Sequence, residues 1–174
     1  MPLPALDPAL LSLQDALDLA ILIEDEAMER YQEFAHQMET HRTPEAAQFF
    51  RYMVENEAKH GRELQARRTE RFGAAPVKVG RDQLWDVEAP VYDAVRAFMT
   101  PRMAMETALA AEVKAYEFFD RALGAITDPE VKALFLELRN EEREHQERVK
   151  AELGKLGPDS GLSDEDFVDP PAPQ

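Results

Sequence analysis

Hydrophobic residues recur at intervals of three and four positions along four stretches of this chain. That interval is the period of an α-helix with one buried face. In the second stretch, for example, Phe50, Met53 and Leu64 share one face, and charged residues occupy the opposite face. The pattern predicts four helices, at about residues 13–40, 44–72, 101–125 and 129–155.

Residues that begin and end helices bracket these four stretches. Ser12 precedes the first stretch, and Asp15 follows three positions later, as in a capping box. Thr43, Thr100 and Asp128 each precede a proline at the first helical position, where the missing N–H group costs nothing. Their side chains are typical caps for free backbone N–H groups. Glycines lie near the predicted ends of the last three helices.

The connections between the predicted helices differ in length. A few residues join the first helix to the second, and a few join the third to the fourth, so each pair forms an antiparallel hairpin. The stretch at about 74–99 is long enough to run the length of a bundle, and residues 91–99 could form a short helix within it. The sequence therefore predicts an all-α ferritin-like four-helix bundle, with two antiparallel hairpins joined by one long crossover.

The end of the chain has a different composition. Residues 157–174 are rich in aspartate and end in a proline-rich run, which is typical of a disordered tail. We therefore expect a bundle domain at 1–156 and a tail at 157–174. Leu162 and Phe167 could make the tail a short docking motif for a partner.

Charge and composition exclude several classes of function. The net charge of −15 argues against nucleic acid as a partner. A negative field attracts metal cations, but an ordinary soluble acidic cytosolic protein would carry the same charge, so charge alone does not separate the two. The absence of cysteine excludes disulfides, zinc–thiolate sites and iron–sulfur clusters. No apolar run approaches the length of a membrane span, and the first residues do not resemble a secretory signal, so we expect a cytoplasmic protein.

A carboxylate interrupts the apolar face of each predicted helix near its middle. These residues are Glu24, Glu57, Glu112 and Glu142. Isolated buried carboxylates are costly, and several in one core repel one another. Two divalent cations would balance their charge, so the pattern indicates a two-metal site.

Two histidines complete the candidate site. His60 follows Glu57 by three positions and His145 follows Glu142 by three, so each pair lies on one helix face. Both members of the first pair recur 85 positions later. A single Glu-x-x-His is often no more than surface charge, but the repeated pattern is the ligand constellation of di-metal carboxylate bundles. Tyr31 and Tyr116 are candidates to hydrogen-bond a ligand carboxylate, with ordinary core packing as the alternative.

These motifs resemble the rubrerythrin-like branch of the ferritin-like superfamily. The segments that carry the resemblance are residues 24–31, 56–60, 112–119 and 141–145. The resemblance implies that Glu57 and Glu142 bridge two ions. It implies that Glu24 and His60 complete one coordination sphere, and Glu112 and His145 the other. Family members reduce peroxide or oxidise ferrous iron, and the fold typically dimerises.

Two departures from the family pattern bear on the reaction. Rubrerythrins usually carry an extra glutamate three residues after the ligand of the third helix, where this chain has Ala115. The six-ligand set is nearer to that of bacterioferritins. The cysteine-bound rubredoxin domain is also missing, so electrons must come from a separate donor or from ferrous iron itself.

We therefore expect a di-iron oxidoreductase, a peroxidase or ferroxidase, that acts on ferrous iron with peroxide or dioxygen as a homodimer or higher homo-oligomer. Manganese and zinc remain alternative metals. An iron storage or delivery subunit of a larger assembly is the second hypothesis. A di-iron hydroxylase of an organic substrate is the third, and a purely structural bundle is disfavoured by the inward carboxylates.

Overall fold

The structure, a computed structural model, describes residues 7–86 and 99–157, and all their side chains except those of 84–86. Its long helices are α1 (Leu13–Thr40), α2 (Pro44–Phe72), α3 (Pro101–Leu123) and α4 (Pro129–Lys155). The short 3₁₀ segments are η1 (Pro8–Leu10) and η2 (Arg81–Asp86). The four predicted helices are all present, and only the end of α3 differs noticeably, coming two residues early.

The helix starts follow the predicted caps with one exception. The side chains of Ser12, Thr100 and Asp128 accept hydrogen bonds from backbone N–H groups in the first turns of their helices. Thr43 makes no side-chain cap, and its hydroxyl instead donates to the carbonyl of Met38. The preceding residue, Arg42, has a left-handed φ of 59°, and this tight turn directs Thr43 back onto α1. The prediction that Thr43 caps α2 was wrong for this reason.

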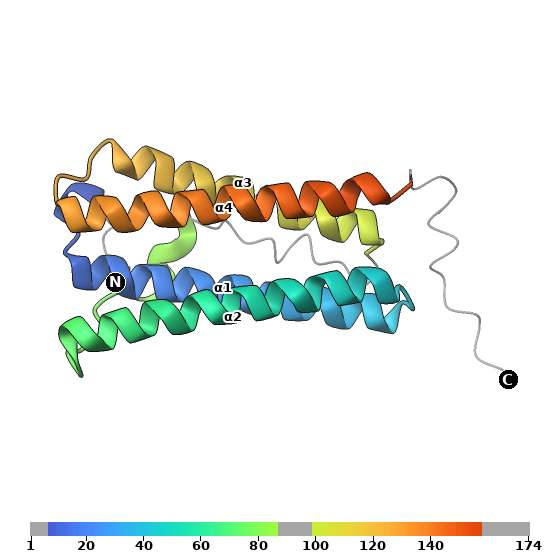
Figure 1. The fold of residues 1–174 in the computed structure, drawn as a ribbon, viewed down its shortest axis with the longest axis horizontal. Coiled ribbons are helices and arrows are strands. Elements are labelled where there is room, and N and C mark those ends of the chain that lie inside the picture. Colours follow the sequence, from blue (N-terminus) through green and yellow to red (C-terminus); the bar gives the residue numbers. More distant parts are fainter. Residues whose placement is uncertain (1–6, 87–98, 158–174) are drawn as a thin grey trace, which may run out of the picture.

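Two antiparallel hairpins lie side by side, α1 with α2 and α3 with α4 (Figure 1). The predicted all-α ferritin-like bundle of two hairpins is confirmed. The connection from α2 to α3 begins at Gly73, whose positive φ of 54° suits a glycine that ends a helix. The predicted helix at 91–99 and the predicted tail at 157–174 both fall almost wholly outside the described residues. The division into a bundle and a tail therefore stays a prediction.

The core is divided into two hydrophobic clusters, one toward each end of the bundle. The first includes Leu17, Leu19, Ile23, Leu64, Phe119, Phe135 and Leu138. The second includes Phe34, Phe50, Met53, Met105, Ala108 and Val149. On each helix the carboxylate predicted to face inward falls between the residues of the two clusters. The candidate site therefore occupies a polar layer between two apolar ones.

A buried ion pair ties the end of α2 to α1. Arg68 Nε donates to Asp18 Oδ1 over 2.8 Å, and both side chains are almost wholly buried. The same guanidinium donates to the carbonyls of Gly73 and Ala75, at 2.8 and 2.6 Å. Arg68 therefore fixes the point at which the chain leaves α2.

No helix within residues 7–86 and 99–157 combines the length and the apolar character that crossing a lipid bilayer requires.

Candidate metal centre

Four carboxylates from four helices lie in the polar layer. Glu24 comes from α1, Glu57 from α2, Glu112 from α3 and Glu142 from α4, and each is exposed over 5% of its surface or less. Placing a charged carboxylate there without a partner carries a large desolvation cost. The layer therefore needs compensating positive charge, either protons or cations.

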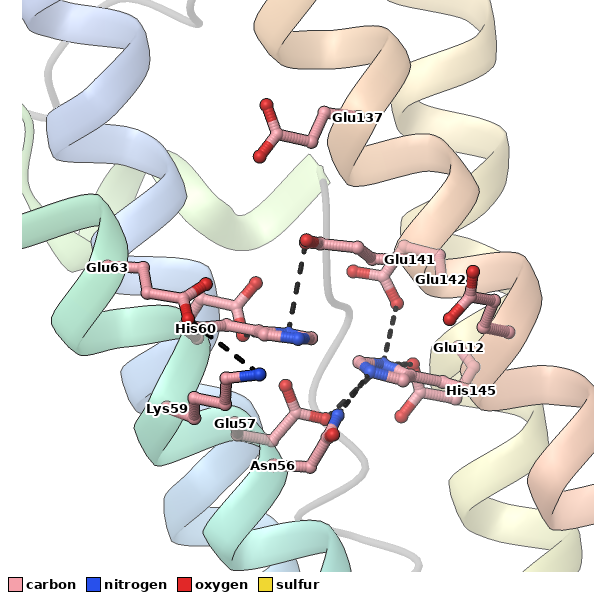
Figure 2. Close-up of polar contacts among 12 residues, drawn as sticks. Asn56, Glu57, Lys59, His60, Glu63, Glu112, Glu137, Glu141, Glu142 and His145 are labelled. Atoms are coloured by element: carbon pink, nitrogen blue, oxygen red, sulfur yellow. Dashed lines mark hydrogen bonds and ion pairs between the residues drawn. The ribbon is translucent and has the colours of Figure 1, made fainter. Parts of the chain in front are cut away.

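His145 on α4 faces three of these carboxylates. Its Nδ1 atom lies 3.3 Å from Glu57 Oε1, 3.4 Å from Glu112 Oε2 and 3.8 Å from Glu142 Oε2. The imidazole is buried, with 3% of its side chain exposed. Residues from three helices thus converge on one side of this ring (Figure 2).

His60 on α2 is the centre of a second group. Its Nδ1 atom lies 3.8 Å from Glu24 Oε2 and 3.8 Å from Glu141 Oε2. The rings of His60 and His145 stack with their centroids 5.6 Å apart and their planes 12° from parallel. Glu57 forms a group of candidate ligand atoms with both histidines, so it lies between the group around His60 and the group around His145, which are the two halves of the site. The structure thus brings all six predicted residues into one layer.

The spacing of these groups suits metal ions. Carboxylate and imidazole donors bind first-row ions at about 2.0–2.2 Å, so two donors of one ion lie roughly 3–4 Å apart. The separations around His60 and His145 fall in that range, which is too long for most direct hydrogen bonds. Glu24 Oε2, Glu57 Oε1 and His60 Nδ1 are buried and have no hydrogen-bond partner. These clusters are consistent with a two-metal site.

The His145 half carries charge of both signs. Burial alone would lower the pKa of His145, but the adjacent Glu112 and Glu57 carboxylates raise it to about 9. Burial alone would raise the pKa of Glu112, but its contact with His145 brings it to about 2. Without a metal, these two residues form an imidazolium–carboxylate pair at neutral pH.

Two other carboxylates of the layer, Glu24 and Glu57, are driven toward their neutral forms. Burial raises the pKa of Glu24 well above its ordinary value, and the charges of Glu142, Glu141 and Glu112 add to the rise. Burial also raises the pKa of Glu57. In the metal-free protein, protons on Glu24 and Glu57 thus neutralise negative charge that cations would otherwise balance, and metal ions would have to displace these protons.

The two tyrosines differ in their surroundings. The hydroxyl of Tyr31, which is fully buried, donates a hydrogen bond to Glu112 Oε1. Burial raises the pKa of Tyr31 well above its ordinary value, so it stays a donor. Tyr116 is half-buried, and its ring lies 6.0 Å from the guanidinium of Arg139.

Two residues of the layer were not among the predicted site residues. They are Asn56, whose amide lies 2.9 Å from His145 Nε2, and Glu141, which faces His60. The spacing gave only a partial signal for Glu141. Glu141 follows the buried Leu138 by three positions and precedes His145 by four, so it lies at the edge of the inward face.

Comparison with known proteins agrees with this geometry. Residues 15–153 match the protein family described as Rubrerythrin. A solved structure of an uncharacterized conserved protein from Magnetospirillum magnetotacticum MS-1 is similar, with 32% identity and a TM-score of 0.71, over 87% of this chain and 100% of that one. Comparison with curated proteins gives no match. Since the family match spans most of the sequence and the predicted resemblance is confirmed, the chain belongs to the rubrerythrin family.

Proposed function

We propose that this protein is a non-haem di-iron oxidoreductase that oxidises ferrous iron with peroxide or dioxygen. The observation that carries the proposal is the pair of buried groups centred on His60 Nδ1 and His145 Nδ1, which share Glu57 between them. Mixed carboxylate and imidazole donors suit iron, although manganese and zinc also bind such sets.

Each predicted residue has a role in this proposal. Glu57 and Glu142 would be shared by the two ions, as the family resemblance implies. Glu24 and His60 would hold one ion, and Glu112 and His145 would hold the other. The hydrogen bond from Tyr31 holds Glu112 in place. Two ferrous ions held by these residues would supply the two electrons that reduction of peroxide to water requires.

The absence of cysteine limits where the electrons for this reaction could come from. The sequence has no cysteine, so it holds no iron–thiolate centre that could feed electrons to the site. A separate donor protein, or further ferrous iron as substrate, would supply them. We further propose that the protein works as a homodimer or higher homo-oligomer.

The bridging roles can be tested by counting bound ions. Metal-free protein titrated anaerobically with Fe²⁺ should take up about two ions per chain. Glu57→Ala and Glu142→Ala should each weaken both positions, because a bridging carboxylate holds two ions. Uptake of one ion with unchanged affinity in both variants would refute the bridging assignment.

The histidines can be tested by the rate of iron oxidation. His60→Ala and His145→Ala should each slow oxidation of bound Fe²⁺ in stopped-flow traces, with helical content unchanged, because alanine is well tolerated inside a helix. His36→Ala is a matched control, since His36 is exposed on α1. Oxidation at the wild-type rate in both site variants would show that the two histidines are ordinary core residues.

A further inference from the structure

We propose that Glu141 is an additional carboxylate ligand of the ion held at His60, so that the two halves of the metal centre differ in charge and coordination. This inference rests on the proposed metal centre and deepens it. The residues concerned are Glu24 on α1, His60 on α2 and Glu141 on α4.

The geometry gives Glu141 the position of a ligand. Its Oε2 atom lies 3.8 Å from His60 Nδ1, the same distance that separates that nitrogen from Glu24 Oε2. All three donor atoms lie within 4.8 Å of one another. In Figure 2, Glu141 and His60 point toward each other from facing helices. One ion between these atoms would satisfy all three.

Two buried atoms in this group have no other role. Glu24 Oε2 and His60 Nδ1 are both inaccessible to solvent and have no hydrogen-bond partner. The side chain of Glu24 is 3% exposed, so water does not compensate it. Buried donors and acceptors without a partner are rare in folded proteins, and a bound ion commonly satisfies those that occur. His60 Nδ1, a buried nitrogen without a hydrogen-bond partner, thus points to a cation independently of the acidic residues around it.

The internal repeat of the chain distinguishes a residue that would bind an ion from one that only orients a histidine. Asn56 precedes Glu57 and Glu141 precedes Glu142, so the two occupy equivalent positions in the two hairpins. Asn56 meets His145 at Nε2, the nitrogen that faces away from the carboxylates. The carboxylate of Glu141 lies near Nδ1 of His60, the nitrogen that faces the carboxylates. Asn56 therefore orients its histidine, whereas Glu141 lies on the side where an ion would bind.

The two halves also differ in exposure. The side chains of His60 and Glu141 are 16% and 25% exposed, against 3% for His145. The His60 half is thus the side of the centre nearer to solvent. Glu141 is placed to contact an arriving ion before the deeper carboxylates do.

The test is a metal titration of the full-length chain. Metal-free wild type, Glu141→Gln and Glu137→Gln are titrated with Co²⁺ and, without oxygen, with Fe²⁺, and the dissociation constants are obtained by calorimetry. Glu137→Gln is the matched control, because it removes the same charge one turn earlier on α4, where Glu137 pairs with Arg67 at the surface. Glu141→Gln should weaken one of the two ions by about tenfold or more. Glu137→Gln should leave both constants close to wild type.

A double-mutant cycle assigns the weakened ion. In a His145→Ala background, where the remaining ion is held at His60, Glu141→Gln should still weaken binding. In a His60→Ala background it should have no further effect. Equal constants in wild type and Glu141→Gln, or equal losses in the Gln variants at 141 and 137, would overturn the inference and leave the metal centre standing. A wild-type chain that binds no pair of ions would refute the centre and Glu141 with it.

Discussion

The side-chain amide of Asn56 lies 2.9 Å from Nε2 of His145, across the interface between α2 and α4. An amide can present either its oxygen or its nitrogen to a ring nitrogen. The amide nitrogen Nδ2 is the atom placed toward the ring. Turned by 180°, the amide would instead present its oxygen, accept a hydrogen bond from Nε2–H and leave Nδ1 of a neutral ring free to face an ion beside Glu57 and Glu112. We expect Asn56 to take this orientation when a metal ion binds, because it selects the tautomer of His145 that a metal ion needs.

We expect Asn56→Ala to weaken the ion held at His145 by roughly 10- to 100-fold, the usual cost of losing a residue that orients a ligand. The helices should persist, because alanine is a strong helix former. Asn140→Ala is the matched control, since Asn140 is exposed on α4. Calorimetric titration with Co²⁺ measures the effect, and identical constants in the two variants would show that the contact has no role in binding.

Much of this architecture follows from local sequence signals. Helical periodicity, prolines at helix starts and short connections define the hairpins, because these features act within a few residues. The inward carboxylates were recognisable because each interrupts an apolar face, as Glu24 and Glu112 do. The match to the rubrerythrin family spans residues 15–153, a range that includes these motifs.

Contacts between helices were harder to predict. Asn56 and Glu141 lie at the edges of their inward faces, where periodicity alone does not distinguish a buried residue from an exposed one. Tyr31 shares a face with Glu24, yet it donates to Glu112 of the other hairpin. Such pairings depend on the rotation and offset of packed helices, which a single sequence does not specify.

The bond from Tyr31 to Glu112 predicts a measurable loss of stability. Tyr31→Phe keeps the ring against Phe34 and Phe50, with centroids 6.5 and 6.0 Å away, but removes a donor to an ionised carboxylate. We expect the metal-free variant to lose about 1.5–3 kcal/mol of unfolding free energy, measured by urea denaturation. Tyr116→Phe, a change at a half-buried ring, should lose much less. Similar losses in the two variants would contradict this role.

The ion pair of Asp18 and Arg68 predicts a stability effect that is independent of metal. Asp18→Asn leaves the guanidinium of Arg68 in the core without its counter-charge. The melting temperature should fall further than in Glu137→Gln, which breaks an exposed pair with Arg67. Combining Asp18→Leu with Arg68→Met should recover part of the loss, because no buried charge is then left unpaired. A double variant less stable than both single variants would contradict this account.

The raised pKa values predict how the metal-free protein responds to pH. Burial raises the pKa of Glu24, Glu57 and Glu141, the last to about 7, so the folded state binds protons more tightly than the unfolded chain. Unfolding free energy must then fall as pH rises from the ordinary glutamate value of about 4.3 through the raised values. His145, with a pKa of about 9, acts in the same direction above its ordinary value of about 6.5.

Two groups oppose this trend without reversing it. The pKa of Glu112 is lowered to about 2, so its contribution changes only below the ordinary glutamate value. Burial and the charge of His145 lower the pKa of His60, a single group set against three carboxyls. Metal-free protein should therefore melt at a higher temperature near about pH 5.5 than near about pH 7.5. Circular dichroism melts in chelator-treated buffer measure this difference.

Bound ions should reverse the same trend. Ions compete with the protons on the carboxylates and on His145, so their affinity rises with pH, and ligands that bind only the folded state stabilise it. With Fe²⁺ at about 100 times its dissociation constant at about pH 7.5, under anaerobic conditions, the gain in unfolding free energy there is about 2.7 kcal/mol, and the same concentration gives a smaller gain near about pH 5.5. The protein should then melt higher near about pH 7.5 than near about pH 5.5. Metal-free and iron-loaded curves that respond to pH in the same direction would show that protons and metal ions do not share these side chains.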